Sequence, residues 1–300
     1  MDLSVSIAGI KFKNPVTVAS GTFGHAEDFY DDKELRRLGA LIPKTVTLFP
    51  RQGNPPPRIV ETPAGMINAI GIENPGVDIF ITDKLPLLKA IGIPVIVSVS
   101  GANYEEFRIL VEKVNAAGVT AVELNLSCPN LGKHSLVAQD PAAVERVVRL
   151  AKKHSRIPVC AKLSPNVTDI AQIAAAAEQG GADALSLVNT FQAMVIDVEK
   201  RRSKLGNFTG GLSGPAIRPI AVFMVHQVYR RIKIPIIAMG GIMAPDDALQ
   251  YIIAGATMAA VGTANFIDPG TPLAVLRGVE DYLKRHGMQR ISELRGSLQS

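Results

Sequence analysis

One cysteine in a polar loop is the residue of this chain best placed to do chemistry. Cys128 stands between Ser127 and Pro129, just past the end of an apolar run. A thiol in such a loop can act as a nucleophile, or as a general base once its surroundings tune its acidity. Acyl transfer would need an oriented histidine, and His134 is the only histidine nearby in the sequence. A base needs no such partner, so proton abstraction is the simpler role.

The second cysteine, Cys160, lies within the apolar run Pro158–Ala161. A free cysteine in such surroundings behaves as a small buried hydrophobe, so we expect it to be inert. Two cysteines exclude a disulfide framework, and the sequence has no CxxC pair or Cys/His cluster. We therefore expect this chain to encode no metal site, neither zinc nor iron–sulfur.

Lysines and glycines stand at the ends of other apolar runs. Lys44 and Lys162 are placed where a cation would face a cavity and hold negative charge, although a lysine there can also extend into solvent. Gly240-Gly241 and Gly262-Thr263 form turns whose bare N–H groups suit a phosphate. No Walker-type lysine follows either turn, which disfavours a nucleoside triphosphate.

Short apolar, β-rich runs supply these ends, and eight of them alternate with helix-period segments. Near-continuous hydrophobicity is typical of parallel strands covered on both faces. The eightfold alternation predicts an α/β fold, a (β/α)8 barrel of the TIM type, with its active site at the C-terminal ends of the strands. A doubly wound open sheet is the main rival, but no GxGxxG follows the first run. The predicted strands are Val16–Ser20, Leu41–Val46, Val95–Ser100, Val122–Ser127, Val159–Ser164, Ala184–Asn189, Ile236–Met239 and Met258–Val261.

Segments outside the eight repeats predict a hairpin and two insertions. Leu3–Ile7 and Ile10–Lys13 flank Ala8-Gly9, which indicates an N-terminal β-hairpin at the bottom of the barrel. The connections 47–76 and 190–214 are long enough to be functional loop insertions at the active site. We find no linker or low-complexity tract, and we expect residues 1–300 to form one barrel domain.

The composition is that of an ordinary globular protein, 47% hydrophobic and 20% charged. The longest apolar stretches are too short to span a bilayer, and no basic region precedes an apolar one at the N-terminus. We therefore expect a cytoplasmic protein with no membrane segment. The net charge is +5, but the basic residues are scattered and their densest run is Lys200–Arg202. A solvated loop explains that run better than a nucleic-acid partner does, with an anionic ligand as the alternative.

Eight short motifs follow one another over nearly the whole chain. They are Ala19–Gly24, Lys44–Thr47, Asn68–Gly76, Asn125–Asn130, Lys162–Asn166, Gly210–Pro215, Gly240–Ile242 and Gly262-Thr263. Any one of them would carry little weight, while eight in the right order are highly specific. Together they resemble the class 1 dihydroorotate dehydrogenases of pyrimidine (UMP) biosynthesis, and Asn125–Asn130 resembles the active-site motif of that family.

The resemblance implies one FMN per chain in the barrel mouth, with dihydroorotate stacked on the flavin. Cys128 would be the base that removes the C5 proton while a hydride passes from C6 to the flavin, and Lys162 would stabilise the anionic reduced flavin. Many members present an asparagine to the flavin where this chain has Ser98, whose shorter hydroxyl offers a different donor set. The implied FMN contacts are Ser20, Lys44, Thr45, Asn125, Lys162, Val188, Gly214, Gly240, Gly241, Gly262 and Thr263. The implied substrate contacts are Lys44, Asn68, Ala69, Ile70, Gly71, Ile72, Asn125, Asn189 and Thr190.

Two stretches, Gly206–Gly214 and Ala260–Phe266, resemble the B-type branch of the family. That branch pairs two catalytic chains with two electron-transfer subunits that carry FAD and a 2Fe–2S cluster and reduce NAD⁺. The alternatives are an A-type homodimer that reduces fumarate and the pyrimidine-reducing barrel of dihydropyrimidine dehydrogenases. A non-catalytic flavoprotein or electron-relay subunit is a further alternative, which the intact Cys128 and Lys44 disfavour.

Overall fold

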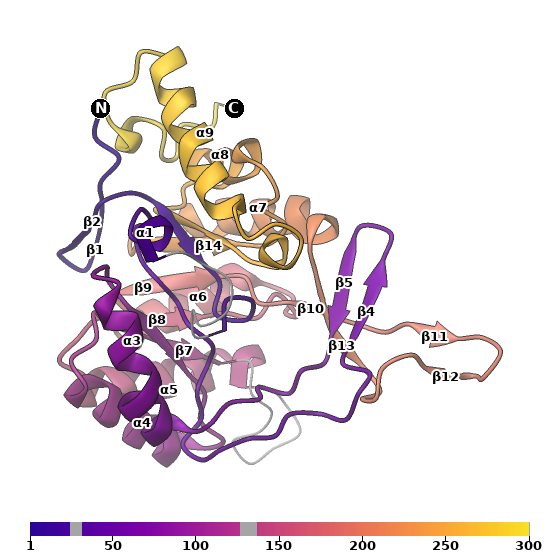
Figure 1. The fold of residues 1–300 in the computed structure, drawn as a ribbon. Helices are drawn as coiled ribbons and strands as arrows, with labels where there is room; N and C mark the ends of the chain where they lie inside the picture. Colours follow the sequence, from indigo (N-terminus) through magenta and orange to yellow (C-terminus); the bar gives the residue numbers. More distant parts are fainter. Residues whose placement is uncertain (25–31, 127–136, 300) are drawn as a thin grey trace.

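The computed structural model describes residues 1–24, 32–126 and 137–299. Within these ranges seven parallel strands curl into a ring, with helices around its outside (Figure 1). The sheet runs in the order β3-β15-β14-β9-β8-β7-β6, so the first barrel strand pairs with the last. The (β/α)8 barrel expected from the sequence is therefore confirmed. Its strands are β3 (Val16–Val18), β6 (Ile96–Val99), β7 (Ala121–Asn125), β8 (Val159–Lys162), β9 (Ala184–Leu187), β14 (Ile236–Met239) and β15 (Met258–Val261).

The segment Leu41–Val46 takes the remaining place in the ring without forming the regular strand that its sequence predicts. Leu41 makes an isolated parallel bridge to Val95, and Val46 makes another to Val99. The bridges are five residues apart on this segment and four apart on the facing one, so one residue is out of register. Pro43 stands between them and has no N–H to donate to a ladder. The segment therefore closes the ring with an interrupted ladder.

The expected N-terminal hairpin is present as β1 (Val5–Ile7) and β2 (Ile10–Phe12). Its turn residues Ala8 and Gly9 both have positive φ, 50° and 80°, as the favoured two-residue hairpin turn requires. The side chains of Ile7 and Phe12 are buried in one cluster with the first residues of several barrel strands. The hairpin therefore plugs the N-terminal end of the barrel.

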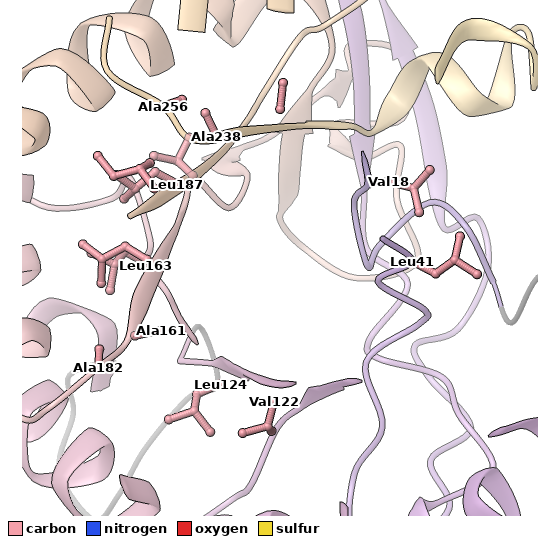
Figure 2. Packing of buried hydrophobic residues seen from close by; sticks show 14 of the residues in the cluster. Val18, Leu41, Val122, Leu124, Ala161, Leu163, Ala182, Leu187, Ala238 and Ala256 are labelled. Atoms are coloured by element: carbon pink, nitrogen blue, oxygen red, sulfur yellow. The ribbon is translucent and has the colours of Figure 1, made fainter. Parts of the chain in front are cut away.

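Side chains of the barrel strands alternate between the interior and the outer surface. Figure 2 shows Val18, Leu124 and Leu163 pointing outward from the ring, into the layer where strands and helices pack together. The interior has polar groups in its middle, among them Ser98 and Glu123, which are fully buried. The inside of the barrel thus becomes polar toward its C-terminal end.

Two of the longer helices between the strands, Tyr104–Ala116 and Pro141–His154, begin at residues whose side chains cap the first turn. Asn103 Oδ1 accepts the N–H of Glu106 at 2.9 Å, and Asp140 Oδ1 accepts that of Ala142 at 3.0 Å. No helix in the described ranges is long and apolar enough to cross a membrane. The helices are α1 (Asp32–Leu35), α2 (Val77–Ile79), α3 (Leu85–Ala90), α4 (Tyr104–Ala116), α5 (Pro141–His154), α6 (Ile170–Gln179), α7 (Arg218–Tyr229), α8 (Pro245–Ile253) and α9 (Thr271–Arg285), with short turns at Phe80–Lys84, Val137–Gln139, Pro215–Ile217, Thr263–Phe266 and Ile291–Glu293.

The two long insertions meet in one antiparallel sheet of order β10-β13-β5-β4. The central pairing joins the two insertions and places Asn68 opposite Gly211. A further small hairpin, β11 with β12, extends outward beyond this sheet (Figure 1). Two loops that are far apart in the sequence therefore form a single wall. The strands are β4 (Ile59–Thr62), β5 (Gly65–Asn68), β10 (Phe191–Ala193), β11 (Ile196–Asp197), β12 (Arg202–Ser203) and β13 (Gly210–Ser213).

Candidate active site

The C-terminal mouth of the barrel holds a cavity of about 520 Å³. Its lining comes from the ends of the barrel strands and from the sheet that the two insertions build. All the predicted FMN contacts line this cavity: Ser20, Lys44, Thr45, Asn125, Lys162, Val188, Gly214, Gly240, Gly241, Gly262 and Thr263. Of the other predicted substrate contacts, Asn68, Ile70, Gly71, Ile72, Asn189 and Thr190 line it as well.

Ala69 is the predicted contact, among those described, that does not line the cavity. It is buried and packs with Ile67 and Leu205. Successive residues of an extended chain point to opposite faces, so Asn68 and Ile70 face the cavity while Ala69 faces away.

Two lysines reach the cavity from different parts of the ring. Lys162, at the end of β8, is only 5% exposed, and its Nζ donates a hydrogen bond of 3.2 Å to Ser20 Oγ. Burial lowers the pKa of Lys44, and the positive charge of Lys162 lowers it further, while Glu73 opposes both. Neither lysine simply extends into solvent. Two cations that disfavour each other in one cavity suit a negatively charged ligand.

Asparagine side chains gather at the same cavity. Asn189 Nδ2 donates to Asn125 Oδ1 at 3.3 Å, across 64 residues of sequence. Asn68 Nδ2 donates to the Gly211 carbonyl at 3.2 Å, across 143 residues. Because an amide offers both donors and an acceptor, these side chains suit a ligand whose edge carries both.

Asn166 and Ser164 line the cavity too, although sequence reasoning did not single them out as contacts. Asn166 Nδ2 lies 3.1 Å from both Ser164 Oγ and the Thr190 carbonyl, and its Oδ1 accepts the N–H of Gln192 at 2.8 Å. This amide therefore ties the end of β8 to the insertion after β9. The signal was present, because both residues belong to the motif Lys162–Asn166.

The glycine turns after β14 and β15 bring bare backbone to the cavity. Gly241 has φ +67°, and a Cβ there would lie 2.7 Å from the Gly214 carbonyl oxygen and 2.9 Å from Arg218 Cβ. Only glycine fits such a position without displacing its neighbours. In the second turn, Thr263 Oγ1 donates to Ser213 Oγ at 2.9 Å. Two such turns at one end of the cavity suit a phosphate group.

Ser98 lies behind the cavity wall. It is fully buried, and its hydroxyl shares a hydrogen bond of 2.9 Å with the Thr45 hydroxyl, which itself belongs to a lining residue. Ser98 therefore supports Thr45 and does not line the cavity. Cys128 and His134 lie outside the described residues, so the role of Cys128 stays a prediction.

Cys160 is fully buried on β8. Burial raises the pKa of its thiol, and the negative charges of Glu123 and Asp183 raise it further. This is the environment of an unreactive thiol. Within the described ranges, no three His, Cys, Asp or Glu side chains are grouped so that they could hold a metal ion.

A barrel whose mouth holds a cationic, amide-lined cavity defines the class of this protein, a (β/α)8-barrel enzyme. The family model described as dihydroorotate dehydrogenase matches residues 2–283, and the chain therefore belongs to the dihydroorotate dehydrogenase family. It is an oxidoreductase, as its sequence predicted.

Relatives over nearly the full chain carry a more specific name. A "Dihydroorotate dehydrogenase B (NAD(+)), catalytic subunit" of Desulforudis audaxviator is 53% identical over 296 residues, 98% of this chain and 96% of that one. The proteins of the same name from Geobacter sp. (strain M21) and Geotalea daltonii are each 50% identical, over 99% of this chain and 98% of theirs.

Proposed function

We propose that this chain oxidises dihydroorotate to orotate, with FMN in the barrel mouth and NAD⁺ as the final electron acceptor. The observation that carries the proposal is the convergence on one cavity of every described residue in the predicted FMN set. The word NAD(+) in the names of the relatives supports the choice of acceptor. The alternative acceptor is fumarate.

The cavity fits FMN in charge and in shape. Because Gly241 has no Cβ, its backbone passes close to the Gly214 carbonyl, and the turn lines the cavity beside the second turn at Gly262-Thr263, where the phosphate would bind. Lys162 and Lys44 supply positive charge for the isoalloxazine and for a substrate carboxylate. When bound, FMN supplies the acceptor for the hydride that leaves C6 of the substrate.

The chain's own residues would bind and orient the substrate. Lys44 and Asn68 would hold its carboxylate, and Asn125 and Asn189 would match the amide edges of the ring. Cys128 would take the C5 proton from the face opposite the flavin. Fixing the ring between these groups lowers the entropic cost of the reaction.

Electron transfer to NAD⁺ would need a partner subunit. The two cysteines of the chain are too few to ligate a 2Fe–2S cluster, and the relatives are named as catalytic subunits. We propose a heterotetramer of two such chains and two subunits that carry FAD and 2Fe–2S, located in the cytoplasm.

One assay tests these steps in order. The purified protein should be yellow, and dihydroorotate should bleach the flavin under anaerobic conditions. Reoxidation is then measured with NAD⁺ alone, with NAD⁺ plus the co-purified partner, and with fumarate. A colourless protein would exclude a bound flavin. Fast reoxidation by NAD⁺ alone would exclude the need for a partner, and fast reoxidation by fumarate would favour the A-type reaction.

A further inference from the structure

The barrel interior contains a carboxylate that the proposed reaction does not use. Glu123 stands in the middle of β7 and is fully buried. The β7–β8 register pairs Glu123 with Cys160 and pairs Asn125 with Lys162. Glu123 therefore lies two residues deeper in the barrel than the lining residue Asn125 on the same strand.

The two carboxylate oxygens of Glu123 have different surroundings. Oε2 accepts a hydrogen bond of 2.7 Å from Ser186 Oγ on β9. Oε1 is buried and has no hydrogen-bond partner among the described residues. Lys162 Nζ lies 4.0 Å from this oxygen. A buried carboxylate oxygen without a hydrogen bond is costly unless a positive charge compensates it, and among the described residues Lys162 supplies that charge.

Other ionisable groups around this pair do not replace either partner. The thiol of Cys160 is kept neutral, since its pKa is raised by burial and by the negative charges of Glu123 and Asp183. Lys44 is a second cation at the cavity, whose pKa is lowered by burial and by the positive charge of Lys162 and raised by the negative charge of Glu73. Within the described ranges, Lys162 Nζ contacts Ser20 Oγ at 3.2 Å and Glu123 Oε1 at 4.0 Å.

We propose that Glu123 is the buried counter-ion of Lys162, a positioning residue that holds the ammonium group at the cavity floor and balances its charge. The consequence for the flavin depends on the proposed function. Lys162 favours the anionic reduced flavin, and a carboxylate 4.0 Å from its ammonium group weakens that preference. Glu123 therefore sets how far Lys162 raises the midpoint potential of the flavin, without touching flavin or substrate.

The experiment is a double-mutant cycle read by the flavin midpoint potential. Glu123→Gln keeps the shape of the side chain and an acceptor for Ser186, and it removes the negative charge. We expect a more positive midpoint potential, because the positive charge of Lys162 is then no longer offset by a neighbouring carboxylate. In the Lys162→Met background the same change should have a much smaller effect, because the ammonium group that Glu123 balances is gone.

A surface charge change provides the matched control. Glu145 on α5 forms an ion pair with the exposed Arg149, so Glu145→Gln removes the same charge far from the cavity and should leave the potential unchanged. An unchanged or more negative potential in Glu123→Gln would overturn the counter-ion role. An equal shift with and without Lys162 would overturn it as well.

A second measurement does not require flavin. The acylation rate of Lys162 by an amine-directed reagent is followed by mass spectrometry at mildly alkaline pH. It should be several-fold faster in Glu123→Gln than in the wild type, and unchanged in Glu145→Gln. Equal rates would overturn the proposal. A wild type that binds no FMN would refute the proposed function and leave this second measurement intact, so the two failures can be told apart.

Discussion

The Tyr251 hydroxyl donates a hydrogen bond of 2.5 Å to the carbonyl of Gly240, which connects α8 to the first glycine turn. The side chain of Tyr251 is fully buried. Burial raises the pKa of the hydroxyl, with Arg218 opposing and Asp247 adding to the increase, so the hydroxyl keeps its proton over the ordinary pH range. The turn that would meet the phosphate is therefore held from behind by a permanent donor.

Tyr251→Phe should weaken both the fold and FMN binding. The Gly240 carbonyl would lose this donor in a buried site, which costs about 1–3 kcal/mol of unfolding free energy. Chemical denaturation measures that loss, and titration of the flavin-free protein with FMN measures affinity. Tyr282→Phe on α9 is the control, since it removes a hydroxyl away from the cavity. Unchanged FMN affinity in Tyr251→Phe would contradict the role of this bond.

Gly241→Ala should abolish FMN binding. The new Cβ would meet the Gly214 carbonyl oxygen at 2.7 Å, and the turn would have to move. Gly92→Ala is a matched control, because Gly92 also has positive φ, +81°, but nothing within 4 Å of a Cβ. Both variants carry similar backbone strain of about 1–2 kcal/mol, and only the first should lose flavin absorbance. Equal flavin content in the two proteins would refute the phosphate site.

As the pH rises, the affinity for orotate should begin to fall at a lower pH than it would if Lys44 had the ordinary pKa of a lysine. Burial and Lys162 lower the pKa of Lys44, so its charge is lost at a lower pH than usual. Only protonated Lys44 attracts the carboxylate, and the dissociation constant should therefore rise as pH passes through the lowered pKa. Flavin absorbance changes report orotate binding across this range. Lys44→Arg should stay charged and bind without that loss. A flat wild-type profile up to the normal lysine range would contradict the assignment.

Cys128→Ala should slow flavin reduction by dihydroorotate by at least about 100-fold, the low end of a general-base contribution. Stopped-flow absorbance under anaerobic conditions gives this rate directly. Cys160→Ala is the natural control, since it removes the other thiol of the chain from a fully buried position and should leave the rate almost unchanged. Near-normal reduction in Cys128→Ala would exclude the base role.

The barrel could be predicted from sequence because each strand and its following helix form a local unit. Apolar runs report burial on both faces, and the polar residues that end them mark the C-terminal mouth. Local pattern was less informative at Leu41–Val46, where Pro43 interrupts the ladder, and at Ala69, where the alternation of an extended chain turns one residue of a motif away from the cavity.

Sequence by itself determined the order of the strands, the polar ends that meet at one mouth, and the motifs of the family. The tertiary structure decided which side chains touch. The hydrogen bond from Asn68 to Gly211 spans 143 residues, and Lys162 lies 4.0 Å from Glu123 on the neighbouring strand. Hydrophobic pattern shows that a residue is buried but not what it is buried against, because its partner depends on strand register and on how separate loops pack together.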